Sequence, residues 1–234
     1  DNYTWNGNIY TESGTFSYNS IDSNINNSYS VYFNGGNDYI NIGRPLSLYN
    51  GDSGSFSVWF KTTAINGAFI SNDTQPTNPE FNFGMSDGKV CVNTGGGSAP
   101  FISSTSNYND GQWHHAVGIK NDGCIELYVD NQLEGQVCSG WTFGYDVADT
   151  GDDYYIGDNR STGSWDYMGL LDDIRIYNKS LSSTEISDLF NCGGSTISNL
   201  VAYYDFETGY GNMSGAMNNM INPWNTCLLY TSPS

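Results

Sequence analysis

The sequence predicts an all-β protein, an antiparallel two-sheet β-sandwich with one short helix near residues 182–190. Runs of alternating apolar and polar residues, rich in aromatic and β-branched side chains, recur along the chain. Clusters of Gly, Asn, Asp and Ser separate these runs at roughly the spacing of sandwich strands. The expected strands are residues 29–35, 38–43, 53–63, 67–72, 81–86, 89–94, 112–120, 124–130, 132–138, 153–158 and 171–178.

The expected helix is the one segment that breaks the strand pattern. Its N-cap is Ser182 or Ser183, because Glu185 then falls in the first turn, where its carboxylate helps to cap the helix. Apolar residues recur at helical spacing and bury one short face. These residues are Leu181, Ile186, Leu189 and Phe190.

Length and charge limit the possible functions. The 234 residues are enough for one large all-β domain, or for a domain with the beginning of another. Seven Lys and Arg stand against 25 Asp and Glu, a net charge of −18, which argues against nucleic acid and anionic membranes as partners. No apolar run approaches the ~18 residues of a membrane span. We therefore expect neither nucleic-acid binding nor membrane insertion.

Two of the five cysteines flank a predicted hairpin. The turn at residues 130–131 pairs Val129 with Gln132 and leaves the flanking cysteines one residue out of register. Cys124 and Cys138 then form a cross-strand disulfide, given a bulge or a diagonal approach, or stay as two buried thiols. The absence of any C-x-x-C pair leaves a zinc site without support. The other cysteines are Cys91, Cys192 and Cys227.

Six N-x-Ser/Thr sequons occur in this Asn-rich chain. Together with the cysteines they favour a secreted glycoprotein, located extracellularly or at a cell surface. The expected glycosylation sites are Asn2, Asn26, Asn72, Asn159, Asn178 and Asn212.

Four segments, in this order, carry a resemblance to a known family: "YSVYFNGGNDYINIG", "SFSVWFKT", "DGQWHHAVGIKNDGCIELYVDNQLEG" and "YYIGDNRSTGSWDYMGLLDDIRIYNKSLSSTEISDLF". They resemble the laminin-G-like jelly-roll modules of the concanavalin A-like lectin and glucanase superfamily. The resemblance covers about residues 1–192 and implies a concanavalin A-like jelly roll. It also explains the late strand and helix as the elements that close such a module.

The resemblance does not bring a catalytic motif with it. Glucanases of this type carry their acids on one strand as E-x-D-x-x-E or E-x-D-x-E, and neither spacing occurs here. A sialidase needs several arginines, and the chain has only Arg44, Arg160 and Arg175. The adjacent His114 and His115 face opposite sides of a strand, so they cannot share a metal, and we expect one to be packed and the other exposed.

The resemblance also implies a structural calcium ion near Asp38 and Asp172. Calcium binds six to eight oxygens, which carboxylates, loop carbonyls and Asn amides supply. The alternative is that Asp38 caps a turn, and that Asp172 or Asp173 pairs with Arg175 or Arg44.

Aromatic residues in two predicted loops, 139–146 and 158–168, are candidates for a carbohydrate site. Exposed rings stack on sugars, and Asn and Asp side chains bind hydroxyl groups. The alternative is that these rings fill the core or the rim of the sandwich. The candidate ligand-binding residues are Trp141, Tyr145, Asp158, Asn159, Trp165 and Tyr167.

The C-terminal part raises a separate question. Residues 193–198 are a Gly/Ser/Asn-rich linker, and residues 199–226 an extra segment whose start, 199–207, resembles the first strand of these modules. This strand closes its own sandwich, giving a circularly permuted module, or it begins a second unit or inserts into a neighbouring copy. Residues 227–234 fit no regular pattern and resemble translated adaptor sequence.

These observations favour a non-catalytic extracellular module for adhesion or carbohydrate recognition, with a glycan or glycoprotein as partner. The alternative is a structural subunit of an extracellular filament or coat, which polymerises with copies of itself through the strand at 199–207. A polysaccharide-active enzyme is the third possibility. The fold alone does not decide among them, because this kind of sandwich supports all three.

Overall fold

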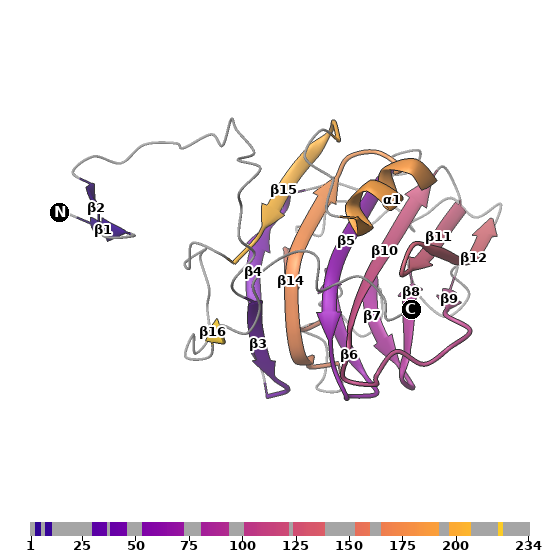
Figure 1. The fold of residues 1–234 in the computed structure, drawn as a ribbon, viewed down its shortest axis with the longest axis horizontal. Coiled ribbons are helices and arrows are strands. Elements are labelled where there is room, and N and C mark those ends of the chain that lie inside the picture. The colour runs from indigo at the N-terminus through magenta and orange to yellow at the C-terminus, as the bar shows by residue number, and fades with distance from the viewer. Residues whose placement is uncertain are drawn as a thin grey trace.

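The computed structural model describes residues 30–36, 38–45, 53–72, 81–93, 101–121, 124–138, 153–159, 165–191 and 197–206. It also describes the backbone of three short strands, β1 (Tyr3–Trp5), β2 (Asn8–Tyr10) and β16 (Met220–Ile221). The described chain forms an antiparallel two-sheet sandwich with one short helix, as the sequence predicts (Figure 1). β1 and β2 pair with each other.

The eight-stranded sheet has the order β12-β11-β10-β5-β14-β3-β16, with β15 also paired to β14. Its strands, besides β16, are β3 (Ser30–Asn34), β5 (Gly54–Lys61), β10 (Trp113–Asn121), β11 (Cys124–Val129), β12 (Gln132–Cys138), β14 (Met168–Tyr177) and β15 (Leu200–Tyr204). The six-stranded sheet has the order β4-β13-β6-β7-β8-β9. Its strands are β4 (Ile40–Gly43), β6 (Gly67–Ser71), β7 (Asn82–Ser86), β8 (Lys89–Asn93), β9 (Phe101–Ser103) and β13 (Tyr154–Ile156).

The main core lies between the two sheets and is rich in phenylalanine. Phe60 of β5 contacts Phe69 of β6 with ring centres 4.6 Å apart, which joins the sheets at their centre. Alternate residues of each strand point into this core, as period-two alternation requires. Burial of this apolar surface is the main term that stabilises the sandwich.

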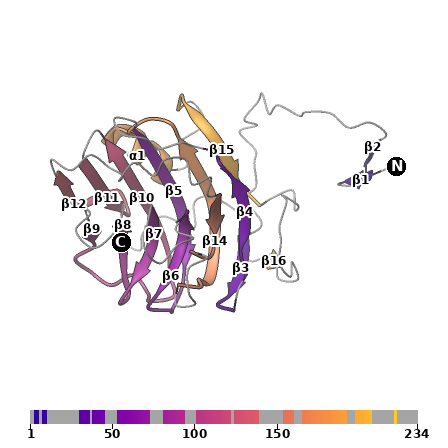
Figure 2. The same cartoon turned by 180° about the vertical axis from the view of Figure 1, so that it is seen from behind.

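Helix α1 (Ser183–Phe190) lies on the outer face of the eight-stranded sheet, in front in Figure 1 and behind in Figure 2. Ser182 is the N-cap, and it forms a reciprocal capping box with Glu185, which confirms the predicted start. Lys179 also forms an ion pair with Glu185. The helix and the sheet share a second apolar cluster, made of Val117, Ile119, Tyr177, Leu181, Ile186 and Leu189.

Strand β14 pairs with three strands of the eight-stranded sheet. One edge pairs with β5, and the other is shared by β3, along 168–171, and β15, along 174–177. Residues 200–204 therefore extend the sheet of their own chain in this structure, and Phe206 beyond them is buried in the main core. β15 fills an edge that would otherwise expose unpaired backbone.

The predicted strand boundaries agree with the structure to within a few residues at most. The largest difference is β14, which begins at Met168, whereas the sequence predicts a start at residue 171. Gly169 interrupts the apolar–polar alternation there. Only glycine fits at this position, because a Cβ atom would lie 2.4 Å from the carbonyl oxygen of Lys61. The short strand β9 has no counterpart among the predicted strands, because only three of its residues pair.

Candidate functional site

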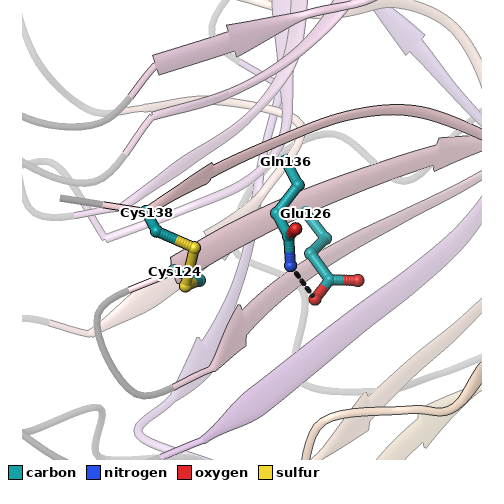
Figure 3. The surroundings of a disulfide bond; sticks show 4 residues. All are labelled: Cys124, Glu126, Gln136 and Cys138. Atoms are coloured by element: carbon teal, nitrogen blue, oxygen red, sulfur yellow. Dashed lines mark hydrogen bonds between the residues drawn. A yellow bond between two sulfur atoms is a disulfide. The ribbon is translucent and has the colours of Figure 1, made fainter.

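Cys124 and Cys138 form the predicted disulfide, at the ends of β11 and β12 away from their turn. Figure 3 shows the bond, with the Gln136 amide donating a hydrogen bond to Glu126 on the neighbouring strand. The pairing beside the turn is the expected one, and a bulge in β12 brings the cysteines into direct register. Cys91 is a buried free thiol whose pKa is raised to about 12 by burial.

Glu134 is the extra residue of this bulge, because its two neighbours both pair with β11. Its carboxylate accepts hydrogen bonds from the backbone N–H and hydroxyl of Thr105, both at 2.8 Å, and from the Tyr108 hydroxyl at 2.6 Å. Partial burial alone raises the pKa of Glu134, but these bonds outweigh it and hold the pKa below its usual range. A charged bulge on an edge strand discourages pairing with another chain.

The two histidines face opposite sides of β10, as predicted. His115 is buried beside Trp59, bonds to the Ser57 hydroxyl at 2.8 Å, and has its pKa lowered to about 3 by burial and by Arg175. Its neighbour His114 is half-buried rather than exposed, because two carboxylates lie against its ring.

His114 lies between two aspartates. Its Nδ1 is 2.7 Å from the Asp130 carboxylate, and its Nε2 is 3.1 Å from that of Asp110. Burial alone lowers the pKa of His114, but the two carboxylates outweigh burial and raise it. The Tyr108 ring covers the imidazole edge-on at 5.0 Å. This group ties the loop before β10 to the turn between β11 and β12.

Asp38 and Asp172, the predicted calcium ligands, do not lie together. The Asp38 carboxylate accepts a hydrogen bond from the Asn34 backbone N–H at 3.0 Å, so it caps the turn after β3. Asp172 follows Leu171, which pairs with Val31. Asn34 and Val31 are three residues apart along β3, a separation of about 10 Å. The two carboxylates therefore do not share one calcium ion.

Asp172 and Asp173 instead shape β14. Asp172 accepts a hydrogen bond from the Asp173 backbone N–H at 2.7 Å, where Asp173 takes a φ of 51° within a bulge of β14. The Asp173 carboxylate pairs with Arg175 at 3.0 Å and accepts from the Tyr203 hydroxyl at 2.6 Å. Burial lowers the pKa of Arg175, but Asp173 raises it more. The aspartate pair thus anchors β15.

No group of three or more His, Cys, Asp or Glu side chains is placed to hold a metal ion within the described residues. Carbonyl and amide oxygens also bind calcium, so the ion itself stays a prediction.

Tyr167, predicted to bind ligand, is fully buried in the main core. Its ring packs edge-on against Phe33 and Phe69, and its hydroxyl donates to the carbonyl oxygens of Lys61 and Leu170 at 3.2 and 3.1 Å. Its ring therefore cannot stack on a sugar, and the prediction for this residue is wrong. The alternation of apolar and polar residues in the sequence does not reveal that the Tyr167 side chain points into the core.

The other predicted ligand residues divide into three groups. Asp158 and Asn159 are buried, at 3% and 4% exposure, at the end of β13. Trp165 is partly exposed, and its carbonyl oxygen accepts a hydrogen bond from the Ala68 backbone N–H at 2.9 Å. The structure thus brings Trp165 beside the six-stranded sheet. The remaining two, Trp141 and Tyr145, lie outside the described residues.

The predicted glycosylation sites differ in access. Asn178 is exposed at the end of β14, and Asn72 is half-buried. Asn159 is only 4% exposed, which leaves no space for a glycan on its side chain. Among these three described positions, glycosylation is therefore expected at Asn178 and Asn72. The remaining sites, Asn2, Asn26 and Asn212, lie outside the described residues.

A row of polar and aromatic side chains crosses the outer face of the six-stranded sheet, and the sequence did not predict it. Each member pairs directly with the next on the neighbouring strand. The alternate residues of these strands fill the main core, so the row points outward. We call it the outer row, and it consists of Asn41, Tyr155, Ser71, Asn82, Asn93 and Phe101.

The outer row is buried at its centre and open toward its ends. Ser71 and Asn82 are buried, and the Ser71 hydroxyl donates to the Asn82 amide oxygen at 2.5 Å. At one end Tyr155 is half-buried beside Tyr39, with ring centres 5.6 Å apart. At the other end Phe101 is 50% exposed. Polar groups between accessible rings are the surface chemistry that sugar rings and hydroxyls match.

Comparison with known families defines the class of protein to which this fold belongs. A model of the concanavalin A-like lectin/glucanases superfamily, of laminin G type, matches residues 34–187. The chain belongs to this family. Neurexin 1 of Drosophila melanogaster is 29% identical over 111 residues, which cover 47% of this chain and 6% of that protein.

Solved structures of the same fold include proteins that bind carbohydrate. A putative carbohydrate binding protein from Bacteroides ovatus matches with a TM-score of 0.61 and 15% identity, covering 83% of this chain and 59% of that one. Domain 4 of an extracellular arabinanase from Geobacillus stearothermophilus, in complex with arabinotriose, matches with a TM-score of 0.55 and 20% identity, covering 76% and 82%. At these identities the likeness establishes the fold alone.

No helix among the described residues is long and apolar enough to cross a membrane. The one described helix has eight residues, and its apolar side packs on the eight-stranded sheet.

Proposed function

We propose that this domain is a non-catalytic extracellular module for carbohydrate recognition or adhesion. The observation that carries the proposal is that a family of lectin-like sandwiches includes this chain, and that its six-stranded sheet has an outward row of Asn, Ser and aromatic side chains. The same fold serves carbohydrate binding in the arabinotriose complex of the arabinanase domain. The extracellular setting agrees with the disulfide on β11 and β12.

Three described carboxyl groups with shifted pKa values support a non-catalytic role. Glycoside hydrolysis needs one carboxyl group whose pKa is raised, so that it can act as a general acid. The pKa values of Asp110, Glu134 and Glu185 lie instead below their usual range. Hydrogen bonds from the protein itself engage each of these carboxylates. They have the properties of structural acids.

A glycan array tests the recognition, with polysaccharide gels and a reducing-sugar assay on the same protein. We expect concentration-dependent binding to a subset of glycans, without release of reducing ends. No binding to any glycan contradicts the recognition, and reducing-end release that copurifies with the protein contradicts the non-catalytic role. Thermal unfolding in calcium and in EDTA tests the predicted calcium ion separately.

A further inference from the structure

We infer that Asn93 and Phe101, at the β8–β9 end of the outer row, form a binding subsite for an uncharged sugar. This inference rests on the proposed function and goes further, because it names the subsite and the class of glycan. Neither residue belongs to the loops in which the sequence predicts the ligand-binding residues.

The two residues are direct partners across an antiparallel pair. Asn93 pairs with Phe101, and the flanking Val92 and Ile102 point into the main core. Partners of this kind have Cβ atoms about 5 Å apart on the same face of a sheet. A ring and an amide therefore stand side by side on the outer face, close to the spacing of a sugar ring and its hydroxyl groups.

Phe101 is the most exposed aromatic residue among those whose side chains the structure describes. The Asn93 side chain is half-buried and forms no hydrogen bond with another described residue. The outer row contains a contrast, because the Asn41 amide donates to Asp153 and Asn82 accepts from Ser71. Asn93 thus keeps two donors and an acceptor oxygen available beside an exposed ring.

This combination matches a sugar better than an apolar peptide. The C–H face of a pyranose or furanose packs on an aromatic ring, while hydroxyl groups at its edge exchange hydrogen bonds with an amide. Ser103, one step further along β9, pairs with Cys91 on the same face and adds a hydroxyl. The surface offers one stacking ring and several polar groups.

The negative net charge of the protein favours an uncharged glycan over an anionic one as the ligand. Anionic sugars need cationic partners, but the protein has a net charge of −18. Its own carboxylates hold Arg44, Arg175 and Lys179 in ion pairs. Lys120 is buried, and Lys89 lies close enough to Glu134 to lower the pKa of that carboxyl. None of these described cations is a direct strand partner of Asn93 or Phe101, so the two residues of the subsite have no cation between them for an anionic sugar.

The test compares glycan binding by the full chain and by three variants, Phe101→Ala, Asn93→Ala and Phe101→Tyr. We expect Phe101→Ala to bind the best neutral oligosaccharide of the array about 10-fold more weakly, and Asn93→Ala about 3- to 10-fold more weakly. Phe101→Tyr keeps the ring and should bind nearly as the parent does. The matched control is Leu133→Ala, which removes an equally exposed apolar side chain from β12.

Each outcome has a separate meaning. If the parent binds no glycan, the proposed carbohydrate recognition fails and the subsite with it. If the parent binds a neutral glycan and both alanine variants bind equally well, the subsite is wrong while the function stands. If the parent prefers sulfated or sialylated glycans over neutral ones at physiological salt, the class is wrong. Near-UV spectra of the variants confirm that each one is folded.

Discussion

The two outer faces of the sandwich differ in what covers them. On the eight-stranded sheet, α1 packs over an apolar cluster that includes Val117 and Ile119 of β10. On the six-stranded sheet, the outer row is polar and aromatic, and no described helix lies over it (Figure 2). The two sheets share one core, so burial between them does not explain the difference.

This difference separates stability from recognition. A face that is apolar and covered contributes to folding, because burial removes its side chains from water. A face that keeps an exposed ring, and an amide with no hydrogen bond to another described residue, gains little in folding, which agrees with the recognition role that we propose for it. Substitutions on the covered face should lower stability, whereas those at the Asn93–Phe101 end should change binding.

The largest loss of stability is expected when β15, which pairs with β14 in the eight-stranded sheet, is removed. A truncation after Ser198 deletes β15 and Phe206, whose ring is buried in the main core. We expect the truncated chain to be monomeric and at least about 3 kcal/mol less stable. Light scattering and denaturant unfolding measure both properties. Polymers formed only by the full chain would favour the structural-subunit alternative instead.

The next largest effect concerns α1. Leu189→Ala removes a fully buried side chain between the helix and the sheet, and should cost about 2–5 kcal/mol in the free energy of unfolding. Leu133→Ala, at a position 55% exposed, should change it by less than about 0.5 kcal/mol. Urea titrations of both variants make the comparison. Equal losses would show that α1 does not cover the sheet in solution.

The disulfide is expected to have an intermediate effect. Cys124 and Cys138 are 14 residues apart, and replacing both with Ser should lower stability by about 3 kcal/mol. Glycan affinity should change less than stability, because neither cysteine is a strand partner of Asn93 or Phe101. Unfolding and binding measured on the same variant decide this point. A parallel loss of binding would place the ligand near β12.

The smallest effects come from the two histidines, which respond to pH in opposite directions. The raised pKa of His114 means that its pairs with Asp110 and Asp130 stabilise the fold fully below about pH 6.5 and lose this contribution as pH rises through the folded value. The pKa of His115, about 3, means that its contribution is present above about pH 6.5 and declines as pH falls.

NMR titration of the imidazole protons separates the two residues. His114 should titrate above pH 6.5, and His115 should stay neutral down to about pH 4. His114→Gln should lose more stability at pH 5.5 than at pH 8.5. A variant that loses more at the higher pH would contradict the ion pairs with Asp110 and Asp130.

The sequence predicts local features of this fold well, for physical reasons. Alternation shows the strands because each one has a buried and an outer side, and Ser182 with Glu185 marks the helix start because capping needs that spacing. The register at the β11–β12 turn likewise brings Cys124 and Cys138 within reach of each other, once a bulge is allowed. These features depend on residues close together in the chain.

The candidate site is harder to predict, because it depends on pairings between distant segments. Tyr167 is an aromatic residue in a loop-like stretch, yet its ring fills the core beside Phe33. Asn93 and Phe101 become neighbours only through the pairing of β8 with β9. Val92 and Ile102 are apolar residues of the kind that faces the core, and they directly neighbour Asn93 and Phe101 in the sequence. This alternation is a signal that could have placed the Asn93 and Phe101 side chains on the outer face.

One measurement tests the central claim, that the face of the six-stranded sheet binds carbohydrate and the face under α1 does not. It is amide hydrogen exchange of the full chain, with and without the best neutral oligosaccharide of the array. We expect slower exchange in β8 and β9 when the sugar is bound, and no change in α1. Slower exchange confined to α1 or to the β13–β14 loops would contradict it.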